Sequence, residues 1–112
     1  MRCRSIILLL LLSSAVSIGS LNISPARALD SARASELTHL VRQDCGSCHG
    51  MTLKGGLGGP LLPENLTDLA SESIASIILG GVPGKPMPPW QGELSDEDAL
   101  WIAQNLKKGF PQ

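Results

Sequence analysis

The sequence predicts an all-α domain whose helices are joined by long loops rich in glycine and proline. Three stretches carry apolar residues at helical spacing, and no stretch alternates apolar and polar residues for long enough to form a strand. Glycines and prolines are dense in residues 50–63, and prolines stand at positions 83, 86, 88 and 89. Because such residues interrupt regular structure, both regions are expected to be loops.

The helices are expected in four places. The first covers residues 31–44, can be capped by Asp30 or Ser31, and leads into a loop over residues 45–65. A short helical turn is expected at residues 64–69. The next helix starts at Ser71, presents Ile74, Ile77 and Ile78 as its apolar face and stops at Gly80-Gly81. The last helix covers residues 95–108, where Ser95 and Asp98 form a variant of the capping box.

The first 28 residues have the pattern of a secretory signal peptide. A basic start precedes a wholly apolar run over residues 6–12, and Ala26-Arg27-Ala28 supplies the small-x-small pattern of a signal-peptidase site. The run is shorter than the roughly 20 apolar residues that a membrane-spanning helix needs, which disfavours an uncleaved anchor. We therefore expect cleavage between Ala28 and Leu29, export of the protein, and a single domain over residues 29–112.

The expected mature chain is acidic. In residues 29–112, four Lys and two Arg stand against ten Asp and Glu, which leaves a net charge of −4. This charge argues against nucleic acid or an anionic membrane as a partner, and it suits a basic docking patch on another protein. We expect a monomer that binds redox proteins.

The most informative motif is Cys45-Gly46-Ser47-Cys48-His49. Two thiols at this spacing can each add to one vinyl group of a haem, and the adjacent imidazole of His49 then lies under the iron. A thioredoxin-like redox pair would need a strand before the motif, a zinc site would need more ligands, and a structural disulfide would not need His49. The motif therefore predicts one haem c, attached covalently through Cys45 and Cys48.

The second axial ligand of the iron must come from elsewhere in the chain. Met51 follows His49 too closely to reach the opposite face of a haem, and His39 is expected to be a solvated side chain on the first helix. Met87 stands among prolines that can hold an extended loop rigidly across that face. We predict Met87 as the ligand, with a gap-filling core methionine as the alternative.

Two further sequence features bear on the haem. The segment Gly58-Gly59-Pro60-Leu61 can pass the proximal edge of the haem and offer a backbone carbonyl to the free ring nitrogen of His49. Trp90 is expected near the haem edge, whereas the sequence leaves open whether Trp101 is buried or partly exposed.

Ligation by histidine and methionine points to electron transfer. A thioether raises the reduction potential relative to two histidines, and an iron with both axial positions filled has no site for a substrate. We therefore expect an electron carrier and not an enzyme. Two rivals remain, namely a protein whose Met87 dissociates so that a small molecule binds the iron, and a component of haem maturation.

These residues resemble the class I cytochrome c family over the whole expected mature chain. The resemblance implies a cytochrome c fold in which the N- and C-terminal helices cross beside the haem and a methionine-bearing loop covers its far side. It also implies that Cys45 and Cys48 attach the haem, that His49 and Met87 ligate the iron, and that the Pro60 carbonyl supports His49. The chain departs from the family by having Asn105 where an aromatic residue is common late in the last helix.

A narrower resemblance rests on three segments: Cys48-His49-Gly50-Met51-Thr52-Leu53 with Gly55-Gly56, Met87-Pro88-Pro89-Trp90, and Lys108-Gly109-Phe110-Pro111. They are similar to those of NirC-type small cytochromes associated with the dissimilatory nitrite reductase that carries c- and d-type haems. The resemblance implies a periplasmic electron carrier in denitrification, serving either that reductase or the maturation of its d-type haem.

Overall fold

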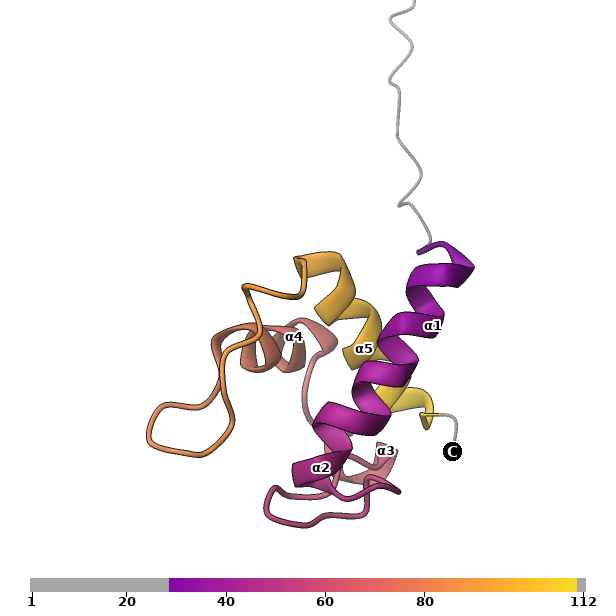
Figure 1. Cartoon of the computed structure of the whole chain (residues 1–112). Coiled ribbons are helices and arrows are strands. Elements are labelled where there is room, and N and C mark those ends of the chain that lie inside the picture. Colours follow the sequence, from indigo (N-terminus) through magenta and orange to yellow (C-terminus); the bar gives the residue numbers. More distant parts are fainter. Residues whose placement is uncertain (1–28, 111–112) are drawn as a thin grey trace, which may run out of the picture.

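The computed structural model describes residues 29–110, so the predicted signal peptide lies outside the described residues. All regular structure in residues 29–110 is helical, as predicted (Figure 1). The elements in chain order are α1 (Ser31–Leu40), a π-helical turn η1 (Val41–Cys45), α2 (Gly46–His49), α3 (Pro63–Leu66), α4 (Ser71–Gly80) and α5 (Asp96–Lys108).

The first helical segment runs further than the sequence predicted. α1, η1 and α2 follow one another without a break, so the cysteine motif is helical and the loop begins at Gly50 instead of residue 45. The hydroxyl of Ser47 donates to the Asp44 carbonyl at 2.7 Å, which supports the helical turn across the motif. The segment ends where Gly50 adopts a φ of 88°, a conformation that glycine reaches without steric cost.

The short helix and the two later helices lie close to their predicted positions. α3 begins at Pro63, one residue before the predicted start, because proline fits the first helical position, where no N–H partner is needed. α4 has the predicted bounds. α5 begins after Ser95, whose hydroxyl accepts from the Asp98 amide while the Asp98 carboxylate accepts from the Ser95 amide, so the predicted capping box is present.

The core lies between α4, α5 and the inner face of the first helical segment. Leu37 and Val41 from that segment are fully buried against Ala99, Ile102 and Leu106 of α5. On α4, Ile74 and Ile78 are buried as predicted, but Ile77 is 39 % exposed. Ile77 lines the cavity described below, which accounts for a large apolar side chain without a protein neighbour over much of its surface.

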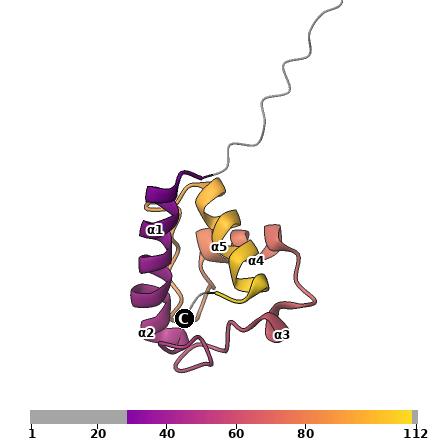
Figure 2. The ribbon, with the colours of Figure 1, turned by 90° about the vertical axis from the view of Figure 1, so that its right-hand side faces the viewer.

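One ion pair ties α1 to α5 where the two helices lie side by side (Figures 1 and 2). The guanidinium of Arg33 donates to both carboxylate oxygens of Asp98, at 3.1 and 2.8 Å, and also to Glu36 at 2.9 Å. This two-bond geometry is the strongest arrangement of arginine and carboxylate. The hydrogen bonds from Arg33 and from Ser95 hold the pKa of Asp98 down, at about 2.

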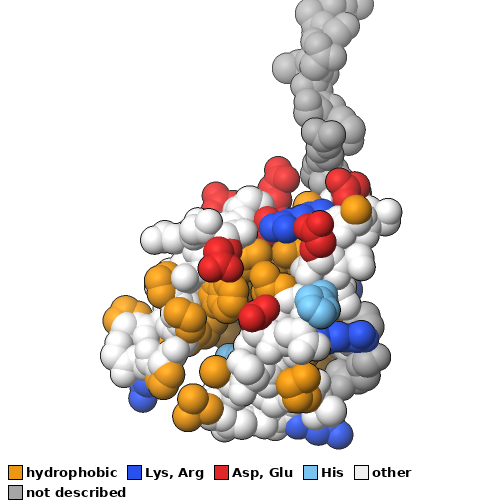
Figure 3. All heavy atoms as spheres, in the orientation of Figure 1, with side chains coloured by type: hydrophobic (Ala, Val, Ile, Leu, Met, Phe, Trp, Pro, Cys, Tyr) orange, Lys and Arg blue, Asp and Glu red, His pale blue; other side chains and the backbone are white. Residues whose placement is uncertain are grey.

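The surface is unevenly charged. Acidic side chains gather at the end of the molecule where α1 and α5 begin, at the top of Figure 3. Hydrophobic side chains are exposed in the middle and at the lower left of the same view. Within residues 29–110, no helix has the length and apolarity required to cross a bilayer.

We expect Asp98→Asn to lower the free energy of unfolding by about 2 kcal/mol at pH 7, the scale of hydrogen bonds to a charged group. Because the pKa of Asp98 is lowered on folding, its contribution is full above the unfolded pKa of about 4 and is lost as the pH falls towards 2. Denaturant unfolding at several pH values should show the variant and the parent converging in that window. Glu36→Gln, a change at an exposed partner of the same arginine, serves as the control, and an equal loss there would contradict the assignment to Asp98.

Candidate haem site

A cavity of about 440 Å³ opens between the cysteine motif, α4 and the loop over residues 82–90. Its lining is mainly apolar and comes from η1, from all helices except α1, and from the two long loops. The motif contributes Cys45, Cys48 and His49, and the loop contributes Met87 and Trp90. The fold therefore brings together four of the five predicted site residues, which are up to 42 positions apart in the sequence.

The imidazole of His49 is held by one hydrogen bond. Its Nδ1 lies 2.7 Å from the carbonyl oxygen of Gly59. Since a carbonyl can only accept, Nδ1 carries the proton and donates it, which leaves the lone pair of Nε2 free to bind a metal. The histidine is thus fixed in the tautomer that a metal ligand requires.

The carbonyl that supports His49 belongs to Gly59 and not to Pro60, so the prediction of Pro60 is wrong by one residue. The glycine loop folds back on the end of α2, where the Gly58 amide donates to the Cys48 carbonyl at 2.8 Å and the Gly55 amide donates to the His49 carbonyl at 2.8 Å. These bonds satisfy carbonyls that the helix end leaves unpaired. They also place the peptide of Gly59, rather than that of Pro60, beside the ring.

Gly58 allows the glycine loop to approach the histidine this closely. A Cβ at this position would lie 2.7 Å from both Cε1 and Nδ1 of His49, far inside van der Waals contact. Gly59, by contrast, would place a Cβ in open space. The sequence indicated that a glycine loop passes His49, but which of the two glycines must lack a side chain follows only from the structure.

The two cysteines of the motif line the cavity. Burial, and to a lesser degree the charge of Asp44, raises the pKa of the Cys45 thiol to about 11. Redox-active pairs depend on a thiol whose pKa is lowered, so this environment opposes the thioredoxin-like alternative. No strand precedes the motif among the described residues either.

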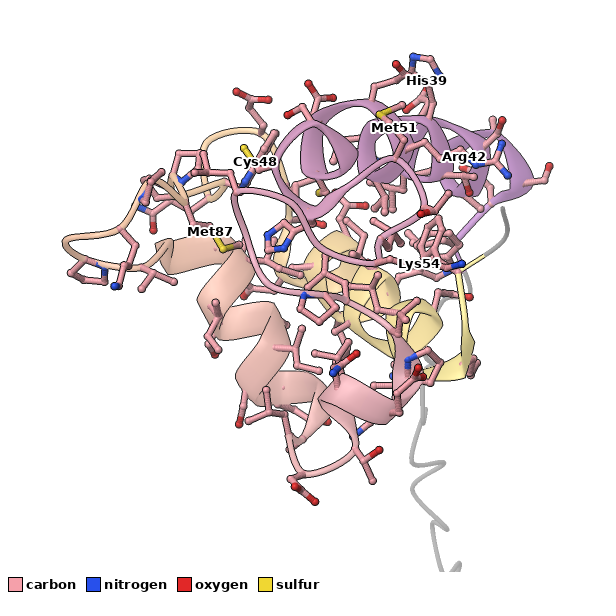
Figure 4. The ribbon with its side chains drawn as sticks, turned by 90° about the horizontal axis from the view of Figure 1, so that it is seen from below. His39, Arg42, Cys48, Met51, Lys54 and Met87 are labelled. Atoms are coloured by element: carbon pink, nitrogen blue, oxygen red, sulfur yellow. The ribbon has the colours of Figure 1, made fainter. Side chains whose placement is uncertain are left out.

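Of the three candidates for the second ligand, only Met87 lines the cavity. Met87 lies on the side of the cavity that faces the motif, whereas His39 and Met51 lie on the outer side of the molecule (Figure 4). His39 is exposed, as expected, and Met51 is 62 % exposed.

The tryptophans differ in their relation to the cavity. Trp90 lines it, and its place near the haem edge stays a prediction. Trp101 is half-buried on α5, and its ring meets that of Phe110 edge to face, with ring centroids 6.1 Å apart. Asn105 on the same helix donates from its side chain to the Trp101 carbonyl at 2.7 Å.

These features fit a covalently held haem. The cavity offers two thiols and one oriented imidazole from the motif, a thioether from the loop over residues 82–90, and a remaining lining that is mainly apolar apart from Asp44 and Lys85. A large, flat and mainly apolar ring fits such a slot, and an imidazole nitrogen with a thioether sulfur is one of the ligand pairs that haem iron takes in proteins.

Comparison with known proteins gives the same result. The family described as "Cytochrome C oxidase, cbb3-type, subunit III" matches residues 32–106. The chain is 51 % identical over 79 residues to cytochrome c55X of Paracoccus denitrificans, covering 70 % of this chain and 77 % of that protein. It is 50 % identical over 80 residues to cytochrome c55X of Pseudomonas aeruginosa, covering 71 % and 67 %. Among solved structures, c-type cytochrome NirC aligns with a TM-score of 0.71 at 49 % identity, over 72 % of this chain and 95 % of that one.

The chain belongs to the NirC-like class I cytochromes c. As a member of this family it carries covalently bound haem c, and its general activity is electron transfer.

A more distant relative of this NirC-like cytochrome is an enzyme. The chain is 37 % identical over 73 residues to dihydro-heme d1 dehydrogenase of Pseudomonas aeruginosa, but the match spans only 15 % of that protein. The solved structure of "Dihydro-heme d1 dehydrogenase NirN in complex with DHE" aligns with a TM-score of 0.60 at 36 % identity, over 66 % of this chain and 16 % of that one.

We expect Gly58→Ala to disturb His49, because the added methyl group must displace either the ring or the glycine loop. The midpoint reduction potential of the haem-loaded protein should then rise, since a weakened Nδ1 hydrogen bond lowers the basicity of the ring and a less basic ring stabilises ferric iron less. Gly59→Ala is the matched control, because its methyl group would meet nothing within 4 Å. Equal potentials for the two variants would show that Gly58 is not required for the approach.

Proposed function

We propose that this cytochrome is a periplasmic carrier of single electrons in denitrification that donates them to nitrite reductase. The observation that carries the proposal is the pairing of an oriented imidazole, His49, with a thioether, Met87, across one apolar cavity. When bound, haem c supplies an iron that changes between the ferric and ferrous states. The protein itself holds the haem, orients the ligands of the iron and excludes water.

In this proposal Cys45 and Cys48 anchor the cofactor, so it does not dissociate between donor and acceptor. His49 would bind the iron through Nε2, and the hydrogen bond to the Gly59 carbonyl would hold the imidazole ring in place when the iron changes charge. Met87 offers a soft sulfur that favours the ferrous state and raises the potential. Apolar lining residues such as Ile74 and Ile78 exclude water, so few polar groups must reorient during transfer.

With His49 and Met87 both holding the iron, the site would be unsuited to catalysis. A substrate would have to displace Met87, and the loop that carries this residue is closed by the bond from the Val82 amide to the Met87 carbonyl and bonded to α4 through the Trp90 amide. The expected signal peptide, residues 1–28, supports the periplasmic location, and the identity of about 50 % to cytochrome c55X supports the same role in this chain.

A second candidate function is a part in the maturation of the d-type haem of nitrite reductase. It is favoured by the similarity to dihydro-heme d1 dehydrogenase, whose name describes the oxidation of dihydro-haem d1. This chain corresponds to a small fraction of that enzyme. It would therefore act as an electron acceptor for such a reaction and not perform the reaction itself.

Met87→Ala should remove the methionine ligand. We expect the midpoint potential to fall by at least about a tenth of the ~0.8 V range over which axial ligands act. We also expect the ferric methionine-to-iron charge-transfer band to vanish and carbon monoxide to bind the ferrous iron. Met51→Ala, a change at an exposed methionine outside the cavity, should leave all three properties unchanged. An unaltered band in Met87→Ala would rule out this ligand, and strong carbon monoxide binding by the unchanged protein would favour an enzyme-like role.

The biological role is tested by measuring which partner protein oxidises or reduces the cytochrome. The purified, reduced cytochrome should be oxidised rapidly when mixed with the haem c and d1 nitrite reductase and nitrite, as seen in stopped-flow absorbance. The maturation role predicts instead that the oxidised cytochrome is reduced when mixed with a dihydro-haem d1 dehydrogenase and its substrate. Reaction with the dehydrogenase alone would overturn the role as donor to the reductase.

A further inference from the structure

The loop that carries Met87 is closed by a hydrogen bond within itself, and its returning side is bonded to the end of α4. On its outgoing side, the Val82 amide donates to the Met87 carbonyl at 3.2 Å. On its returning side, the Trp90 amide donates to the carbonyls of Ile78 and Leu79 at 3.2 and 3.1 Å. The returning chain thus satisfies carbonyls that the C-terminus of α4 would otherwise leave unpaired. The helix end and the loop form one unit.

Gly81 lies at the point where this unit is most tightly packed. Its φ is 67°, and a Cβ there would lie 2.7 Å from the nitrogen of Pro89, 2.8 Å from the carbonyl carbon of Pro88 and 2.9 Å from the carbonyl oxygen of Met87. All three atoms belong to the backbone, so no side-chain rotation can relieve the contact. The segment is also stiff because Pro88 and Pro89 fix their own φ angles.

We propose that Gly81 is a positioning residue for the distal face, setting the distance of the Met87 sulfur from the iron through its contact with the backbone of residues 87–89. This proposal rests on the ligand role of Met87 given above. A side chain at position 81 pushes that backbone away from α4, and the neighbouring prolines pass the displacement to Met87 instead of absorbing it. Sequence patterns marked Gly81 only as a helix stop, a role that Gly80 shares.

The chain provides two matched controls. Gly80 is helical, and a Cβ there would meet nothing within 4 Å. Gly84 lies in the same loop with a φ of 75°, and a Cβ there would also meet nothing within 4 Å. Gly80→Ala therefore tests the addition of a methyl group next to the site, and Gly84→Ala tests backbone strain without close contact. Only Gly81→Ala combines the strain with contact against the ligand-bearing segment.

The test uses the haem-loaded proteins and measures the ferric methionine-to-iron charge-transfer band, the reduction potential and the carbon monoxide affinity of the ferrous iron. We expect Gly81→Ala to weaken the band, lower the potential and raise the affinity for carbon monoxide at least tenfold. Gly80→Ala and Gly84→Ala should match the parent. Thermal unfolding followed by far-ultraviolet circular dichroism reports the strain in all three variants, and a purely structural role would lower the melting temperature of Gly81→Ala without moving the three haem properties.

A double variant keeps the test decisive if Gly81→Ala does not fold. Pro89→Gly relieves the contact of the added methyl group with residue 89 so that the chain can fold, while Pro88 still passes the displacement to Met87; Gly81→Ala/Pro89→Gly should therefore bind carbon monoxide more tightly than Pro89→Gly alone. Equal affinities would overturn the proposal. The ligand assignment fails separately: if Met87→Ala leaves the band intact, the proposed function is wrong, whereas loss of the band in Met87→Ala but not in Gly81→Ala rejects only the role of Gly81.

Discussion

The hydrogen bond between His49 and the Gly59 carbonyl joins the two segments on which the haem site depends. One is the helical segment that carries the cysteines, and the other is the glycine loop that folds back on its end. The bond fixes the tautomer and the tilt of the imidazole, and therefore the plane in which a haem must lie. Residues of α4 and of the loop that carries Met87 line the same cavity as the motif. They therefore bound the space in which the haem must lie.

Glycines at close backbone contacts recur on both sides of this plane. On the proximal side, Gly58 lets the loop reach the ring of His49. On the distal side, Gly81 lets residues 87–89 lie against the end of α4. At each position the neighbouring atoms approach the glycine more closely than a Cβ would permit. Each close contact therefore restricts the movement of a segment that carries a ligand. A redox centre benefits from such tight support, because ligands that stay in place as the iron changes charge lower the reorganisation that accompanies transfer.

The small size of the domain explains why the core is arranged around the cavity. Few large side chains are fully buried, among them Leu37, Val41 and Ile102, and a domain of this length buries a limited apolar surface. Ile77 remains exposed where it lines the cavity. The apolar cofactor thus completes a core that the protein alone leaves open, while the ion pair of Arg33 and Asp98 fixes the crossing of α1 and α5 at the far end.

The sequence by itself determined the helical class, the capping box at Ser95, the bounds of α4 and the chemistry of the cysteine motif. These properties depend on residues close together in the chain, so local spacing is sufficient to predict them. Only the tertiary structure decided that Gly59, rather than Pro60, supports His49, and that the motif is helical through its last residue. It likewise distinguished Gly81 from Gly80, because those outcomes depend on backbone contacts between segments that no local pattern records.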